Sequence, residues 1–144
     1  MSYNVRLEES TIKITKENMK RLMMELSSDK GEGIDIRYMD DFYYEDIDWS
    51  ILYLEVLDEN KWTVEDIWAS CFGYYINYNP IDKVYTIEDK RYEGFGDDDD
   101  FFNLIAKYIE DGGYLEFYGE DGTRFRLVIN GNECIEKHPK IIWD

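Results

Sequence analysis

Two tight-turn sequences in the last third of the chain constrain its fold more than any other feature. Asp121-Gly122 and Asn130-Gly131 separate runs in which apolar and polar residues alternate. Asp-Gly and Asn-Gly favour the backbone conformations of short hairpin turns, and alternation directs every second side chain to one face of a sheet. The sequence therefore predicts a meander of three antiparallel strands over 114–118, 123–129 and 133–138. Pro139 interrupts the last run, which indicates an edge position or a bulge.

The first part of the chain predicts a strand followed by a helix. Apolar and polar residues alternate over 3–14, which is typical of a strand. Thr15 is a good helix N-cap residue. Four apolar residues then recur at the spacing of one helix face, namely Met19, Leu22, Met23 and Leu26. Gly31 and Gly33 follow as stop signals.

A second helix, a hairpin and a third helix are predicted further along. Thr63 with Asp66 forms a capping-box variant, and Ile67, Trp68 and Cys71 would face inward. Two aromatic and β-branched runs surround the turn Asn79-Pro80, which favours a hairpin. Gly94 and Gly96 break the chain after it. The acidic run 97–100 precedes a helical apolar pattern formed by Phe101, Leu104, Ile105, Tyr108 and Ile109.

The segment between these elements is ambiguous. Ile34, Ile36 and Tyr38 alternate as in a short strand. Asp48 could cap a helix over the next residues, but the composition of 51–57 and the turn sequence after it favour a strand. Together the elements predict an α+β fold within a single domain, 1–144. We expect an antiparallel sheet of about five to seven strands packed against two or three helices.

The charge of the chain is concentrated in its middle. The formal net charge is −17. Residues 32–100 hold most of the 33 Asp and Glu residues but fewer than a third of the 16 Lys and Arg residues. Such a field repels nucleic-acid phosphates and anionic membranes and attracts basic proteins. Solubility alone is the alternative reason for this charge.

No residue pattern in the chain indicates an enzyme, a metal or a cofactor. The one histidine, His138, follows Cys134 by four residues, and on a strand these positions lie roughly 13 Å apart. Two Cys and one His do not give zinc-site spacing, and the acidic run lacks the spacing of a calcium loop. No phosphate-binding glycine motif is present, and among so many acids no carboxylate pair can be chosen as catalytic.

The chain start and the cysteines favour a cytoplasmic protein. The first residues lack the apolar region of a signal peptide, and no apolar stretch approaches the roughly 18 residues of a membrane helix. Cys71 and Cys134 are expected to be reduced and to serve packing.

Two acidic segments are the candidate partner-binding sites. The first alternates acids with large aromatics, and such anchors within a steering charge suit a protein interface. Its members are Asp40, Asp41, Phe42, Tyr43, Tyr44, Glu45, Asp46, Asp48 and Trp49. The alternative is that the aromatics are core and the acids form the solvated face. The second segment comprises Asp97, Asp98, Asp99 and Asp100. These residues could start a helix, contact a partner or bind a metal.

Three stretches of the chain resemble known sequences. They are the stretch from Tyr108 to Gly131, the closing Lys-Ile-Ile-Trp-Asp and the opening Thr-Ile-Lys-Ile-Thr-Lys-Glu-Asn. The chain resembles a group of small uncharacterised acidic proteins of Gram-positive bacteria and their phages and mobile elements. That resemblance implies an accessory gene and brings no catalytic residues. At the level of class, the chain is similar to anti-restriction and anti-CRISPR inhibitors.

The resulting expectation is a non-enzymatic inhibitor, acting in the bacterial cytoplasm. Its partner would be a basic nuclease or a restriction or CRISPR effector, because such proteins hold nucleic acid in positively charged channels. Direct nucleic-acid and membrane binding are not expected. One alternative is an immunity protein that neutralises a nuclease toxin. Another is a small-ligand binding protein or a carboxylate-based hydrolase.

Overall fold

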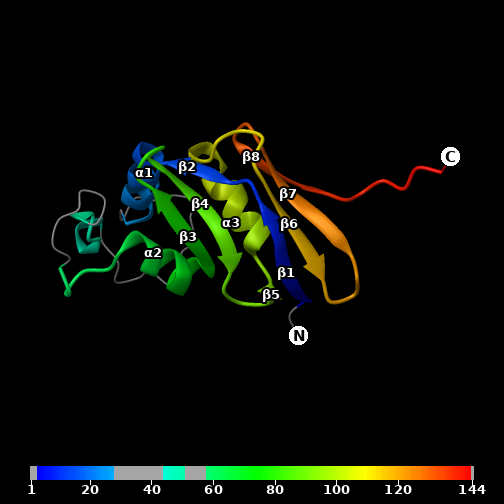
Figure 1. Ribbon diagram of the computed structural model, residues 1–144, viewed down its shortest axis with the longest axis horizontal. Helices are drawn as coiled ribbons and strands as arrows, with labels where there is room; N and C mark the ends of the chain where they lie inside the picture. The colour runs from blue at the N-terminus through cyan, green and yellow to red at the C-terminus, as the bar shows by residue number, and fades with distance from the viewer. Residues whose placement is uncertain (1–2, 28–43, 51–57, 144) are drawn as a thin grey trace.

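The computed structural model describes residues 3–27, 44–50 and 58–143. Its strands are β1 Tyr3–Ser10, β2 Lys13–Thr15, β3 Tyr74–Asn79, β4 Val84–Lys90, β5 Gly94–Phe95, β6 Tyr114–Gly119, β7 Arg124–Asn130 and β8 Glu133–Lys137. Its helical segments are α1 Lys16–Leu26, the 3₁₀ turn η1 Tyr44–Asp46, α2 Val64–Ile67, the π-helical η3 Trp68–Phe72, α3 Asp98–Ile105 and the 3₁₀ turn η4 Ala106–Tyr108. The predicted α+β class with antiparallel sheets and helices is confirmed (Figure 1).

The larger sheet has five strands in the order β5-β1-β6-β7-β8, and it contains the predicted meander. Gly122 and Gly131 take φ values of 84° and 65° in its two turns, which is the left-handed region that glycine adopts at no steric cost. Strand β8 lies at the edge, as Pro139 indicated. The strand already ends at Lys137, so Pro139 follows the strand rather than interrupting it.

The smaller sheet has the order β2-β4-β3, and it contains the predicted hairpin around Asn79-Pro80. The Asn79 side chain accepts from the backbone N–H of Ile81 at 2.9 Å and so organises the turn. The single strand expected over 3–14 is divided into β1 and β2, which belong to different sheets. Buried Ile12 and Ile14 lie at this crossing, so the N-terminal segment connects the two sheets.

The helices bury one face each, as their spacing predicts. The Thr15 hydroxyl oxygen accepts from Asn18 N–H at 3.1 Å, and the four apolar residues of α1 named above are all buried. In α3, Phe102 and Ile105 are buried, whereas Leu104 is exposed, contrary to the expected pattern. The predicted helix was also too long. Its last expected residue, Ile109, follows η4 in extended backbone, where its side chain is buried.

The aromatic core joins the helices to both sheets. Figure 1 places α3 in the middle of the molecule, between the hairpin β3–β4 and strands β6–β8. Trp68 is fully buried, and its ring lies 5.1 Å from that of Phe72 and 5.9 Å from that of Phe101, both in edge-on contacts. Ile67 and Trp68 face inward as predicted, while Cys71 is only half-buried against the core.

Replacing Thr63 by alanine is expected to lower the free energy of unfolding by about 1 kcal/mol. The Thr63 hydroxyl oxygen accepts from Asp66 N–H at 3.1 Å, and the Asp66 carboxylate accepts from Thr63 N–H at 3.3 Å. This is the predicted capping box. Alanine at position 63 leaves the Asp66 N–H group without its acceptor. Urea unfolding of Thr63→Ala and Thr63→Ser measures the effect. Equal destabilisation of both variants would contradict it, because serine retains the hydroxyl.

Candidate functional site

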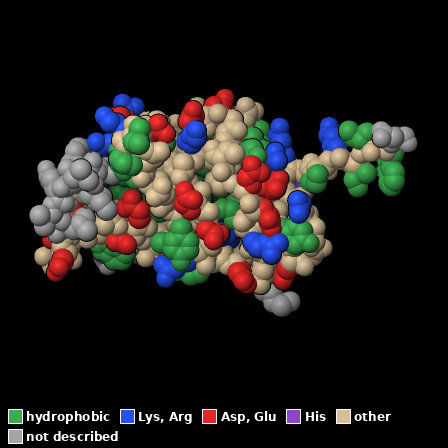
Figure 2. Space-filling view, in the orientation of Figure 1, with side chains coloured by type: hydrophobic (Ala, Val, Ile, Leu, Met, Phe, Trp, Pro, Cys, Tyr) green, Lys and Arg blue, Asp and Glu red, His purple; other side chains and the backbone are tan. Residues whose placement is uncertain are grey.

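An exposed acidic surface lies where β4, β5 and α3 follow one another. Its exposed carboxylates belong to Glu88, Asp89, Glu93, Asp97, Asp99 and Asp100, and we call this set the acidic rim. Figure 2 shows acidic side chains across the middle of the face drawn, with the basic side chains mostly toward its edges. The six rim residues lie within 88–100 of the chain, and their exposed carboxylates belong to the general negative charge of the protein.

The backbone that carries the rim is fixed at several points. Glu93 C=O accepts from Val5 N–H at 2.7 Å, and Gly73 C=O accepts from Arg91 N–H at 2.8 Å. Between these bonds and α3, the short strand β5 pairs with β1. The predicted break at Gly94 and Gly96 is therefore a two-residue edge strand followed by a turn. These bonds tie the acidic connection to both sheets.

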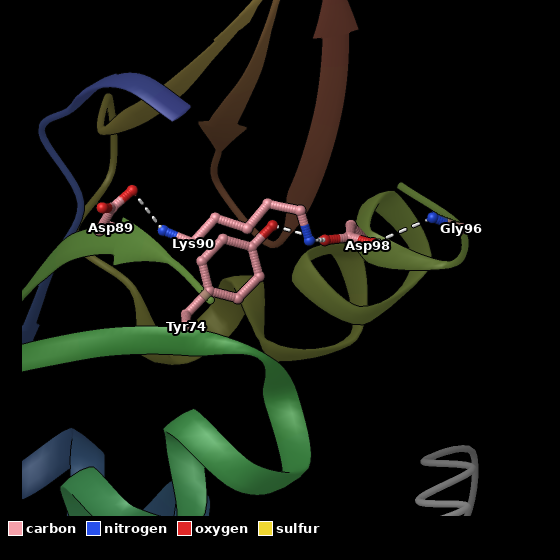
Figure 3. Close-up of polar contacts among 5 residues, drawn as sticks. All are labelled: Tyr74, Asp89, Lys90, Gly96 and Asp98. Carbon is pink, nitrogen blue, oxygen red and sulfur yellow. Dashed lines mark hydrogen bonds and ion pairs between the residues drawn. The ribbon is translucent and has the colours of Figure 1, made fainter. Parts of the chain in front are cut away.

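Three polar side chains from β3, β4 and the start of α3 form a largely buried cluster (Figure 3). The Lys90 ammonium lies 2.9 Å from the Asp98 carboxylate, and the two side chains are 5% and 13% exposed. The Tyr74 hydroxyl donates to the same oxygen at 2.6 Å, and Gly96 N–H donates to the other at 3.2 Å. The Lys90 ammonium also lies 5.0 Å from the centroid of the Tyr74 ring. Asp98 is thus directed inward, unlike its three acidic neighbours in the run 97–100.

Burial raises the pKa of the Tyr74 hydroxyl. Removal from water raises the pKa of Tyr74 well above 10.0, and the charge of Asp98 and the hydrogen bond to it raise this pKa further. The hydroxyl therefore remains a neutral donor at neutral pH. This keeps the Tyr74–Asp98 hydrogen bond intact across the physiological pH range.

Raising the pH above 10 is expected to lower the free energy of unfolding through Tyr74. In the unfolded chain its hydroxyl ionises near 10.0, before the native hydroxyl does. The stability linked to this proton is complete below that pH and is lost as the pH rises toward the native pKa, by about 1.4 kcal/mol per pH unit. Urea unfolding at about pH 9 and about pH 11, for wild type and Tyr74→Phe, measures the difference.

The same pH dependence in both proteins would contradict this assignment. Tyr3 and Tyr114 also have raised pKa values, chiefly because each donates a hydrogen bond to a carboxylate, Asp121 and Glu9 respectively. Their ionisation also lowers the free energy of unfolding as the pH rises, and it does so equally in wild type and in Tyr74→Phe. Only the difference between wild type and Tyr74→Phe reports on Tyr74.

Cys71 and Cys134 are not joined in a disulfide. His138 Nε2 lies 3.0 Å from a Glu136 oxygen, and the Cys134 backbone N–H donates to Asn103 at 3.0 Å. Burial, followed by the charges of Asp99 and Glu136, raises the pKa of Cys134 to about 11. A thiol with that pKa is protonated at neutral pH and is a poor nucleophile. Within residues 3–27, 44–50 and 58–143, no three His, Cys, Asp or Glu side chains group as metal ligands.

The described part of the first candidate segment is tied into the fold around Asp48. The Asp48 carboxylate is buried and accepts from the N–H and hydroxyl of Ser50 and, at 2.5 Å, from Asp58 N–H. The Ser50 hydroxyl contributes most to lowering the pKa of Asp48, followed by the Asp58 N–H. Asp48 N–H donates to Trp62 C=O, next to a parallel bridge between Ile47 and Trp62. This carboxylate thus holds Ser50 and Asp58 at one point of the fold.

Tyr44 and Trp49, the two described aromatic residues of this segment, pack against the core. The rings of Tyr44 and Trp49 lie 5.5 Å apart and are half-buried against the core, and Lys20 of α1 lies 5.7 Å from the Trp49 ring. Glu45 is exposed and Asp46 half-buried. The other four members, Asp40, Asp41, Phe42 and Tyr43, lie outside the described residues. Figure 1 shows η1 at the left end of the view, away from α3, so the two candidate segments are not brought together.

Sequence reasoning missed an arginine–tyrosine face on the larger sheet. The pairing of β1, β6 and β7 places Arg6 and Arg124 on either side of Tyr118. Their guanidinium carbons lie 5.2 Å and 5.4 Å from the Tyr118 ring centroid, and that of Arg126 lies 4.1 Å from the Tyr114 centroid. The alternation of apolar and polar residues along β6 and β7 could have predicted that the residues of these two strands share a face. The role of β1 depends on a pairing across the length of the chain.

In the part of the chain that the structure describes, no helix has the length and apolar character needed to cross a membrane. No protein-family model matches this chain, and no curated protein or solved structure matches it.

Proposed function

We propose that this protein is a non-enzymatic acidic inhibitor that binds the basic nucleic-acid site of a host defence protein. The expected partner is a nuclease, or a restriction or CRISPR effector, in the bacterial cytoplasm, and the expected source is a phage or mobile element. The observation that carries the proposal is the acidic rim. Its six exposed carboxylates run from the end of β4 to the first turn of α3, and two of them, Glu93 and Asp97, lie on the connection 91–97. The backbone of that connection is hydrogen-bonded to Val5 of β1 and to Gly73, which precedes β3.

The physical basis is the replacement of phosphates by carboxylates. A protein of net charge −17 is drawn toward a basic channel at long range, which raises the rate of encounter. At contact, the rim would occupy positions that nucleic-acid phosphates take in the channel. Exposed charges separated by more than about 10 Å are screened at 0.1 M salt, so binding should weaken as salt rises.

Affinity capture from a bacterial lysate with three matched baits tests the proposal. The baits are wild type, a rim variant with Glu93→Gln, Asp99→Asn and Asp100→Asn, and a control variant with Glu17→Gln, Glu110→Gln and Glu133→Gln. All six residues are exposed. Both variants lose three negative charges, but from different residues of the surface.

The proposal predicts that wild type and the control recover the same basic nucleic-acid-binding protein at low salt. The rim variant should recover much less of it, and high salt should release it from all baits. Recovery that is equal for the rim variant and the control would contradict the assignment to the rim. Recovery of no nucleic-acid-binding protein by wild type would contradict the proposed function itself.

A further inference from the structure

We propose that Lys90, Asp98 and Tyr74 are positioning residues that hold the acidic rim in its binding orientation. This inference rests on the proposed function, because it assigns these residues a role in the same surface. Tyr74 is buried, and the side chains of Lys90 and Asp98 are only 5% and 13% exposed, so the three offer little surface to a partner. They would act through the exposed carboxylates on either side of them.

The location of the ion pair is the first argument. Lys90 is the last residue of β4, and Asp98 is the first residue of α3. Their side chains meet at 2.9 Å and so close the connection 91–97, which carries Glu93 and Asp97 of the rim. Gly96 N–H, within that connection, donates to the second oxygen of the same carboxylate. One carboxylate therefore holds the hairpin, the connection and the helix start together (Figure 3).

Helix geometry gives the second argument. Successive residues of an α-helix project about 100° apart around its axis. Because Asp98 is directed inward to Lys90 and Tyr74, the next two residues must project in other directions. Asp99 and Asp100 are accordingly exposed. Fixing the Asp98 side chain thus fixes the rotation of the first turn of α3 and, with it, the directions of two rim carboxylates.

The energetics of burial give the third argument. Removing an ammonium and a carboxylate from water costs several kcal/mol each, and their attraction repays this only when the geometry is good. An apolar pair at the same place would often be as stable or more stable. The fold retains a largely buried pair whose carboxylate, that of Asp98, also accepts from Tyr74 and Gly96. A requirement for one defined arrangement explains this better than a requirement for stability.

The test removes the ion pair without leaving a buried charge. The variant Lys90→Met/Asp98→Asn keeps the net charge, retains an acceptor for Tyr74 and leaves every rim carboxylate in place. The matched control is Lys107→Met/Glu25→Gln, which removes an exposed ion pair of 3.1 Å between η4 and α1. The measurements are amide hydrogen exchange along the chain, the urea unfolding midpoint, and the dissociation constant for the basic protein recovered with the wild-type bait.

We expect the unfolding midpoint of Lys90→Met/Asp98→Asn to stay near that of wild type. Exchange in 91–97 should rise roughly tenfold or more, while exchange in β6 and β7 stays unchanged. The dissociation constant should rise by at least about fivefold, and the control should change neither quantity.

Unchanged exchange in 91–97 would overturn the inference, whatever the binding result. Faster exchange with an unchanged dissociation constant would also overturn it, because the connection would then be held without serving binding. If wild type captures no basic protein, the proposed function fails. The exchange measurement still decides whether the three residues hold the connection.

Discussion

Replacing Glu93, Asp99 and Asp100 by their amides is expected to weaken binding to the basic partner roughly tenfold to a hundredfold at low salt. The three carboxylates are exposed on the acidic rim, and none of them accepts a hydrogen bond in the contacts described above. Their loss removes three short-range attractions and part of the steering field. The change should appear in the association rate as well as in the affinity, because exposed charge acts on diffusional encounter.

The rim variant should remain folded, since surface substitutions away from buried contacts change stability little. Asp99 and Asp100 lie in the first turn of α3, where each carboxylate is worth about 0.3–1 kcal/mol through the helix dipole. The control variant with Glu17, Glu110 and Glu133 replaced loses the same charge elsewhere. Equal weakening by both variants would show that only the total charge matters, and that the rim is not the contact surface.

Replacing Trp68 by alanine is expected to lower the free energy of unfolding by about 3–5 kcal/mol. Trp68 is fully buried at the junction of α2 and η3, and its ring meets Phe72 and Phe101 edge-on. Alanine leaves a large cavity that these neighbours can fill only in part. Because small domains are stable by about 5–15 kcal/mol, this one change removes much of the total.

Two further variants keep this prediction testable if Trp68→Ala does not fold. Within the described residues the indole N–H of Trp68 has no hydrogen-bond partner, so Trp68→Phe loses volume but no hydrogen bond. Trp68→Phe should lower the free energy of unfolding clearly less than Trp68→Ala does. The Trp62 side chain is 49% exposed. Its replacement by alanine should lower the free energy of unfolding by no more than roughly 1 kcal/mol. Similar unfolding midpoints for Trp68→Ala and Trp62→Ala would contradict the assignment of Trp68 to the core.

Those parts of the fold that depend on neighbours in the chain could be predicted. The turns at Gly122 and Gly131, the hairpin at Asn79-Pro80 and the caps at Thr15 and Thr63 are each set by a few adjacent residues, and all are confirmed. The division of the strands into two sheets could not be predicted. It depends on the pairing of β1 with β6, which joins residues more than a hundred positions apart, and alternation along β1 does not identify its partner.

The candidate site was predicted only in outline. The run 97–100 was correctly placed at a helix start, but its four aspartates look alike in the sequence. Only the fold shows that Asp98 is directed inward, because its partners Lys90 and Tyr74 come from the hairpin. Likewise, Asp48 is one acid among several in the sequence. In the fold its carboxylate is buried and accepts from N–H groups of Ser50 and Asp58, the second of which lies ten positions away in the sequence.

Competition with nucleic acid measures whether the acidic protein occupies the nucleic-acid site of its partner. The basic protein recovered by capture is mixed with a fluorescently labelled DNA or RNA that it binds, and the acidic protein is titrated into the complex while anisotropy is followed. We expect wild type and the control variant to release the labelled nucleic acid. The rim variant should need a much higher concentration, and added salt should weaken the competition. A stable ternary complex, in which the acidic protein binds without releasing the nucleic acid, would contradict the claim that its carboxylates occupy the nucleic-acid site.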